Sequence, residues 1–140
     1  MEFITVEQFK EQPEEVQKVF LDWWKPEIGD IFDWIKAKGE VNNDLRKMEC
    51  CNSENIIEMT NCFKGIKEGD RIPLFTEGQL RKFIEDKTGG KVDASFNGET
   101  YTVYSNEDFG LIIKMYEDID SDLLQAYWKV ACMIAKEEIK

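Results

Sequence analysis

The spacing of apolar residues near the start of the chain predicts two short helices. Thr5-Val-Glu-Gln8 has the spacing of a capping box, in which two side chains satisfy each other's free backbone N–H groups, so a helix is expected to start there. Pro13 interrupts it and opens a second helix that runs to about Lys25, because proline is tolerated in a first helical turn. The apolar residues of this second helix recur at spacings of three and four: Val16, Val19, Phe20, Trp23 and Trp24. The two adjacent tryptophans differ by about 100° around a helix, so one of them is expected to be less buried.

The next part of the chain favours strands joined by loops. Ile28–Ala37 is rich in apolar and aromatic residues without a helix start or stop signal, which predicts a strand followed by a turn at Lys38-Gly39. Residues 40–53 are polar and aperiodic and are expected to form a loop. A second strand at Asn55–Phe63 and a turn at Lys67–Asp70 complete this part.

Thr76–Gln79 repeats the capping-box spacing and predicts a helix that carries Leu80, Phe83 and Ile84 on its apolar face. The helix is expected to end at Gly89-Gly90. Thr88–Lys91 has some likeness to a phosphate-binding loop. It follows a helix and precedes a strand, however, which is the reverse of a P-loop, so the sequence favours a helix C-cap.

Two runs of alternating residues then flank Asn97-Gly98, a pair that favours a type I′ hairpin turn because both residues accept a positive φ. Pairing outward from a two-residue turn places Phe96 opposite Glu99 and Val92 opposite Val103.

Leu111–Tyr116 predicts a further strand, and Ser121–Lys140 predicts a long helix with an acidic start that suits the helix dipole. The apolar stripe expected to pack that helix across the sheet consists of Leu124, Tyr127, Trp128, Ala131, Ile134 and Ala135. Helices and antiparallel strands without alternating β-α-β units indicate an α+β fold. We expect a single domain over residues 1–140, with an antiparallel sheet of four to five strands packed by two or three helices.

The charge of the chain limits the kinds of partner that it can bind. The formal net charge is −11, a field that repels nucleic acid and anionic membranes and attracts basic surfaces. Residues 1–35 hold nine acids and three bases, and residues 107–122 hold six acids and one lysine, whereas residues 64–91 are slightly basic. Solubility alone would also account for this acidity.

The sequence contains few residue patterns that are typical of catalytic or metal-binding sites. The chain has no histidine, which excludes Ser-His and Cys-His dyads and His-bearing zinc sites. Cys50, Cys51, Cys62 and Cys132 lack C-x-x-C spacing, and we expect ordinary reduced thiols with Cys132 in the core. Asp118-Ile-Asp-Ser-Asp122 begins like a calcium loop but lacks its glycine and its final glutamate, so an acidic helix start is favoured. We expect neither an enzyme nor a bound metal or cofactor.

The location of the protein is predicted from its apolar runs and its first residues. No run approaches the roughly 20 residues that cross a bilayer, and the opening residues are acidic where a signal peptide is basic. A cytoplasmic protein with no membrane partner is therefore expected.

Three stretches resemble small proteins carried by phages and prophages of clostridia and related Gram-positive bacteria: Val16–Pro26, Ile72–Asp86 and Asp122–Glu137. The resemblance implies an accessory phage protein that acts in the cytoplasm of a bacterial host. It implies no activity and no site residue.

Three classes of function follow. The first is a non-enzymatic inhibitor of a host defence protein with a basic surface, which would use acids of residues 1–35 and 107–122, above all Glu107, Asp108, Glu117, Asp118, Asp120 and Asp122. The second is a small-ligand binder that sequesters a nucleotide defence signal through Arg71, Arg81, Lys82, Lys87 and Lys91. The third is a replication or structural accessory of the phage. The sequence makes no prediction of the oligomeric state.

Overall fold

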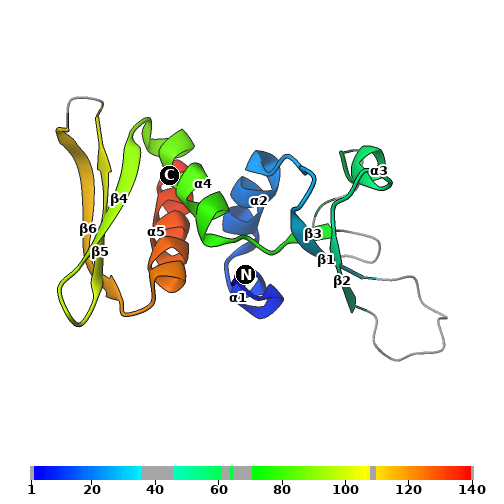
Figure 1. Ribbon diagram of the computed structural model, residues 1–140, viewed down its shortest axis with the longest axis horizontal. Coiled ribbons are helices and arrows are strands. Elements are labelled where there is room, and N and C mark those ends of the chain that lie inside the picture. The colour runs from blue at the N-terminus through cyan, green and yellow to red at the C-terminus, as the bar shows by residue number, and fades with distance from the viewer. Residues whose placement is uncertain (1, 36–45, 61–63, 65–70, 108–109, 140) are drawn as a thin grey trace. The chain divides into compact units, whose positions relative to one another are not determined.

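The computed structural model of the chain describes residues 2–35, 46–60, 64, 71–107 and 110–139. These residues form five helices and two three-stranded antiparallel sheets, which confirms the α+β fold class (Figure 1). The prediction of one sheet with four to five strands is wrong, because the strands divide between two separate sheets. Among the described residues, no helix is long and apolar enough to span a membrane.

The chain divides into two compact units. The N-terminal unit is Thr5–Phe75, and the C-terminal unit combines Met1–Ile4 with Thr76–Lys140. Phe3 joins the C-terminal unit through an isolated antiparallel bridge to Thr76. Each unit contains one of the two sheets. The single domain expected for residues 1–140 stays a prediction.

The N-terminal unit begins with α1 (Val6–Lys10) and α2 (Glu14–Trp23). The predicted capping box is confirmed, since Thr5 accepts from the Gln8 N–H and the Gln8 side chain accepts from the Thr5 N–H. Pro13 is the N-cap residue of α2. Trp24 is buried and Trp23 is half-buried, as the angle between them predicts.

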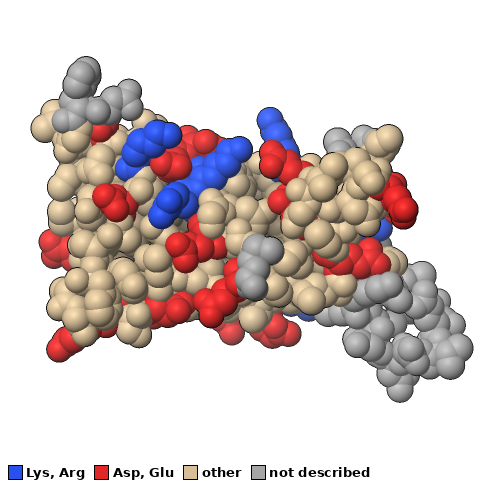
Figure 2. Space-filling view, viewed as in Figure 1, with Lys and Arg blue, Asp and Glu red and all other residues tan. Residues whose placement is uncertain are grey.

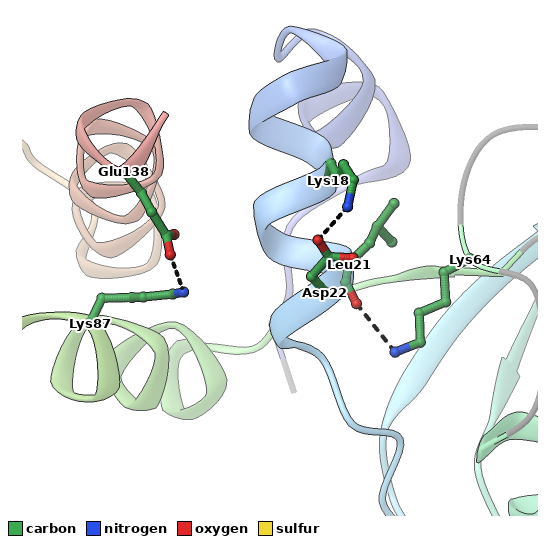
Figure 3. Close-up of polar contacts among 6 residues, drawn as sticks. All are labelled: Lys18, Leu21, Asp22, Lys64, Lys87 and Glu138. Carbon is green, nitrogen blue, oxygen red and sulfur yellow. Dashed lines mark hydrogen bonds and ion pairs between the residues drawn. The ribbon is translucent and has the colours of Figure 1, made fainter. Parts of the chain in front are cut away.

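Lys64 binds the end of α2. Its ammonium group donates to the carbonyl oxygen of Leu21 at 3.2 Å (Figure 3). It also donates to the carbonyl oxygen of Trp24 and lies 5.4 Å from the centre of the Trp24 ring. A cation at this position satisfies free carbonyl groups and complements the negative end of the helix dipole. Lys18 and Asp22 form an exposed ion pair on the same helix, which contributes little to stability.

The sheet of this unit has the order β2-β1-β3, with β1 (Ile31–Ile35) in the centre. β1 lies within the predicted strand Ile28–Ala37. The loop predicted for residues 40–53 is wrong in part, because β2 (Arg46–Cys50) pairs antiparallel with β1. Backbone hydrogen bonds to β1 hold this polar edge strand in place. Its own residues do not alternate between apolar and polar, so the sequence gives no sign of a strand. β3 (Arg71–Pro73), which the sequence did not predict, is the other edge, where proline is tolerated.

The strand predicted at Asn55–Phe63 is also wrong, because α3 (Ile56–Thr60) is a helix. Asn52 explains its start, since its side chain accepts from the Glu54 and Asn55 N–H groups at 2.9 Å each. The Asn55 side chain in turn accepts from the Asn52 N–H at 2.7 Å. Asparagine thus takes both roles of a capping box, a variant of the pattern that a search for Ser or Thr with Glu or Gln overlooks. The turns predicted at Lys38-Gly39 and Lys67–Asp70 lie outside the described residues.

In the C-terminal unit, α4 (Glu77–Thr88) confirms the second capping box and ends at the glycine pair. The two glycines have different roles. Gly89 adopts the left-handed conformation of a helix C-cap, with φ +77°. Gly90 has no room for a side chain, because an added Cβ would lie 2.5 Å from Ser105 Oγ and 2.6 Å from the Asn106 carbonyl oxygen. The pair therefore ends the helix and lets β5 approach it closely.

The predicted hairpin is present as β4 (Lys91–Phe96) and β5 (Tyr101–Asn106), but its predicted register is wrong by two residues. Phe96 pairs with Tyr101 instead of Glu99, and Val92 pairs with Ser105 instead of Val103. The turn is longer because the Asn97 side chain accepts from the backbone N–H groups two and three residues on, at 2.9 Å each. A slip of two residues preserves the side-chain alternation, so Val92 and Val103 remain on the same face, where both are buried.

β6 (Ile112–Asp120) completes the sheet β4-β5-β6, and α5 (Leu123–Glu138) packs on β5 and β6. All six residues of the predicted α5 stripe are buried, and Cys132 lies in the core. α4 and α5 lie on the same side of the sheet, and among the described residues of this unit no helix covers the other side (Figure 1). One face of the sheet is therefore core and the other is surface.

Replacing Gly90 by alanine should destabilise the protein by about 1–3 kcal/mol, because the added methyl group meets backbone and side-chain atoms of β5. Gly78 in α4 is the matched control, since a Cβ there meets nothing within 4 Å. Gly78→Ala should raise stability by up to about 1 kcal/mol through helix propensity. Urea unfolding of both variants measures the difference, and a neutral Gly90→Ala would contradict the close approach.

Candidate functional site

The structure places most of the predicted acidic candidates on or beside β6. Glu117, Asp118 and Asp120 lie within the strand, and Asp122 is the N-cap residue of α5. Glu107 follows β5, and its N–H donates to the Leu111 carbonyl oxygen (2.7 Å) just before β6 begins. Asp108 lies outside the described residues.

Asp118 has a conformational role in the sheet. It is the one non-glycine residue with a positive φ (+51°) among the described residues. Its carboxylate accepts from the Thr100 hydroxyl (3.1 Å) and the Asn97 side-chain amide (3.4 Å), and so connects β6 to the hairpin turn. Both donors are neutral, so this carboxylate keeps an uncompensated charge at an exposed position.

Asp120 and Asp122 organise the start of α5. Asp122 accepts from the Gln125 N–H at 3.0 Å, and Asp120 accepts from the Asp122 N–H at 2.9 Å. Asp120 also forms an ion pair with Lys129 on α5 (2.7 Å). The hydrogen bond from Lys129, together with that from the Asp122 backbone, lowers the pKa of Asp120 below its ordinary value. The acidic helix start is therefore explained by local structure.

Alternate residues of β6 face α5. Lys114 forms an ion pair with Glu137 on α5, which is the main cause of its raised pKa. The Tyr116 hydroxyl oxygen is buried, and burial raises the pKa of this tyrosine. Because side chains alternate along a strand, Met115 and Glu117 point away from α5. Within the described residues, Glu107 and Glu117 have no side-chain hydrogen bond or ion pair.

Exposed apolar side chains lie between these acids. Leu111, Ile112 and Met115 are exposed to 66, 51 and 46%. Glu99 in the hairpin turn is adjacent to Thr100, the partner of Asp118, and adds another exposed acid. We define the β6 surface by its exposed members: Glu99, Glu107, Leu111, Ile112, Met115, Glu117 and Asp118.

Sequence reasoning missed four members of the β6 surface, Glu99 and the three apolar residues. Leu111–Tyr116 predicts a strand without indicating which of its apolar residues stay exposed. A signal was present in the sequence, since Ile112 and Ile113 are adjacent apolar residues and cannot both face one helix on a regular strand.

The five predicted basic residues are divided between the two units. Arg71 belongs to the N-terminal unit, and the other four belong to the C-terminal unit. Lys82 and Lys91 line a shallow depression of about 590 Å³ near the end of α4, together with Glu85 and Asp86. Basic side chains gather over α4 in Figure 2, yet the two carboxylates offset the two ammonium groups at this depression.

The remaining basic candidates of this unit have structural contacts. The Arg81 guanidinium group donates to the Tyr127 hydroxyl (3.4 Å), a contact that raises the pKa of Arg81. Lys87 extends from α4 to form an ion pair with Glu138 of α5 at 2.8 Å (Figure 3). These two residues therefore connect α4 to α5.

Burial in the core changes the reactivity of one of the described thiols. Cys50, Cys51 and Cys132 are free, and Cys62 lies outside the described residues. Burial raises the pKa of Cys132 to about 12, so its nucleophilic thiolate form is scarce at neutral pH. Within the described parts of the chain, no group of three or more His, Cys, Asp or Glu residues is arranged to hold a metal ion.

Comparison of the chain with known protein families, curated proteins and solved structures finds no match.

Asp122→Ala should destabilise the protein by about 1 kcal/mol, because the Gln125 N–H loses its acceptor at the start of α5. Asp122→Asn is the matched control, since asparagine caps a helix about as well and lacks the charge. Thermal unfolding of both variants separates the capping role of the side chain from the effect of its charge. Equal destabilisation of both would contradict the capping role and indicate that the charge matters.

The lowered pKa of Asp120 should make part of the stability depend on pH. The folded carboxylate resists protonation more than the unfolded one, so its contribution is complete above the ordinary pKa of 3.8 and is lost as pH falls below it. Asp120→Asn should lose stability less steeply than the wild type when urea unfolding is followed from about pH 5 to pH 3. Glu2→Gln, a charge change without an ion pair among the described residues, should keep the wild-type slope.

Proposed function

We propose that the protein is a non-enzymatic binding protein that holds a basic protein surface against the β6 surface. The observation that carries the proposal is the composition of the β6 surface, in which exposed apolar residues of the first half of the strand lie between Glu107, which precedes it, and Glu117 and Asp118 in its second half. Glu107 and Glu117 are exposed and have no internal partner among the described residues, so their charges are available to another molecule. An apolar centre with a charged rim is the usual anatomy of a protein interface.

The electrostatic field supports a basic partner. The whole chain carries a net charge of −11, and the one lysine on β6 is paired with Glu137. Complementary charge accelerates encounter and selects against acidic competitors. The resemblance to phage and prophage proteins supplies the biological setting. We propose an inhibitor of a bacterial host defence protein that acts in the host cytoplasm.

The other two classes have less support. A nucleotide-sequestering protein needs several cations around one pocket, whereas the described basic residues are distributed over ion pairs, a hydroxyl contact and a depression shared with two acids. No observed feature favours a replication or structural accessory over a binding protein.

Charge reversal of the two unpaired acids tests the proposed function. The double variant Glu107→Lys, Glu117→Lys should lose at least about tenfold of its partner affinity, because two attractive contacts become repulsive. Tagged wild type and variant would be used to capture proteins from an extract of a clostridial host. Mass spectrometry identifies the captured protein, and titration with that purified protein gives both affinities.

The matched control carries the same charge change elsewhere. Glu2→Lys, Glu11→Lys alters two exposed acids that are not members of the β6 surface and raises the net charge by the same amount. This control should bind like the wild type. Equal losses in both double variants would show that only net charge matters, and unchanged binding in both would make the proposed function wrong.

A further inference from the structure

β6 is an edge strand with a free outer side. The sheet order is β4-β5-β6, and within the described residues β6 pairs only with β5. An edge strand presents unpaired N–H and C=O groups that another chain can bond by adding a strand. The main chain of β6 is thus a second binding element beside its side chains.

The side chains of β6 indicate what kind of strand would fit. Its most exposed apolar residues, Ile112 and Met115, lie between Glu107, which precedes the strand, and Glu117 and Asp118 further along it. A complementary segment therefore has small or medium apolar residues in its middle and Lys or Arg at its ends. Lys114 does not oppose this pattern, because Glu137 neutralises it.

We propose that β6 binds the partner by strand addition, with an extended partner segment that has an apolar centre flanked by Lys or Arg. This inference rests on the proposed function and specifies how the partner is held. Main-chain hydrogen bonds along β6 supply affinity, and the acids at both ends select basic flanks.

The irregularities of β6 limit the length of the added strand. Its register with β5 shifts between Ser105 and Asn106 and again between Tyr101 and Val103, and Asp118 has φ +51°. Because such bulges interrupt a regular ladder, the regular part of β6 is Lys114–Tyr116, and an added strand of about three to five residues fits there.

A second copy of this chain matches the site less well. Pairing of β6 with β6 of a second copy would bring two acidic surfaces together, with Glu107, Glu117 and Asp118 on each. The net charge of −11 on each copy also opposes self-association.

The other edge strand offers a comparison within the same sheet. β4 exposes Lys91, Asp93 and Ser95 and, at its last position, Phe96, so its charges are mixed and its large exposed apolar residue lies at the end of the strand. The same peptide should therefore choose β6 over β4.

Selective methylation of a peptide backbone tests strand addition directly. The probe is the end-blocked peptide Lys-Lys-Thr-Val-Thr-Val-Thr-Lys-Lys, titrated against the full chain by fluorescence anisotropy. Two derivatives carry N-methyl groups, one on the odd-numbered amides and one on the even-numbered amides. Alternate amides of a strand point to opposite sides, so one derivative should lose at least about tenfold in affinity and the other should keep it.

Amide hydrogen exchange locates the bound peptide. β6 amides should exchange more slowly with the peptide, whereas β4 amides should not change. Replacing all lysines of the peptide by glutamate should abolish binding, because the β6 surface is acidic. Equal affinities of the two methylated derivatives, protection of β4 alone, or no binding of the parent peptide would each overturn strand addition.

The outcomes also separate this inference from the proposed function. If the peptide fails but capture of the partner still depends on Glu107 and Glu117, strand addition is wrong and the binding role stands. Partner binding unaffected by the double charge reversal would refute the proposed function itself. Sedimentation that shows a dimer at micromolar concentration, with β6 protected without peptide, would identify a second copy as the occupant and overturn the inference.

Discussion

A single long helix covers only one face of a three-stranded sheet, and this constraint determines what the C-terminal unit exposes. α5 buries its apolar stripe against β5 and β6, and α4 packs beside it. One face of the sheet is then buried against the helices, and the other is exposed. Each residue of β6 has its role set by that division: Lys114 and Tyr116 contact the helix side, whereas Met115 and Glu117 face outward.

The acids around β6 combine folding and surface roles. Asp118 ties the strand to the hairpin turn, and Asp120 and Asp122 organise the first turn of α5. Their donors are mostly neutral amide and hydroxyl groups, so local structure uses the oxygen lone pairs without cancelling most of the negative charge. A high density of acids can thus be required by the fold and still define the electrostatic character of a surface.

The sequence predicted the features that depend on neighbouring residues. Thr5 and Thr76 start helices through contacts three residues away, and Gly89 ends one through its own φ. The hairpin faces were predictable for the same reason, although the Asn97 side chain lengthened the turn and moved the register.

Features that depend on distant partners were not predictable. β2 is a strand because β1 lies beside it, and nothing in its own polar residues indicates that neighbour. The division into two sheets likewise follows from long-range pairing. Most of the candidate acids lie on or beside one strand because they are near one another in sequence, whereas the candidate basic residues are divided between two units.

The distribution of tryptophan has an optical consequence. Trp23, Trp24 and Trp34 lie in the N-terminal unit, and Trp128 on α5 is the tryptophan of the C-terminal unit, with 4% of its surface exposed. In a chain where the other three indoles are replaced by phenylalanine, emission therefore comes from the helix that holds the C-terminal sheet. Its emission spectrum therefore reports whether α5 stays packed while the conformation of the rest of the chain changes.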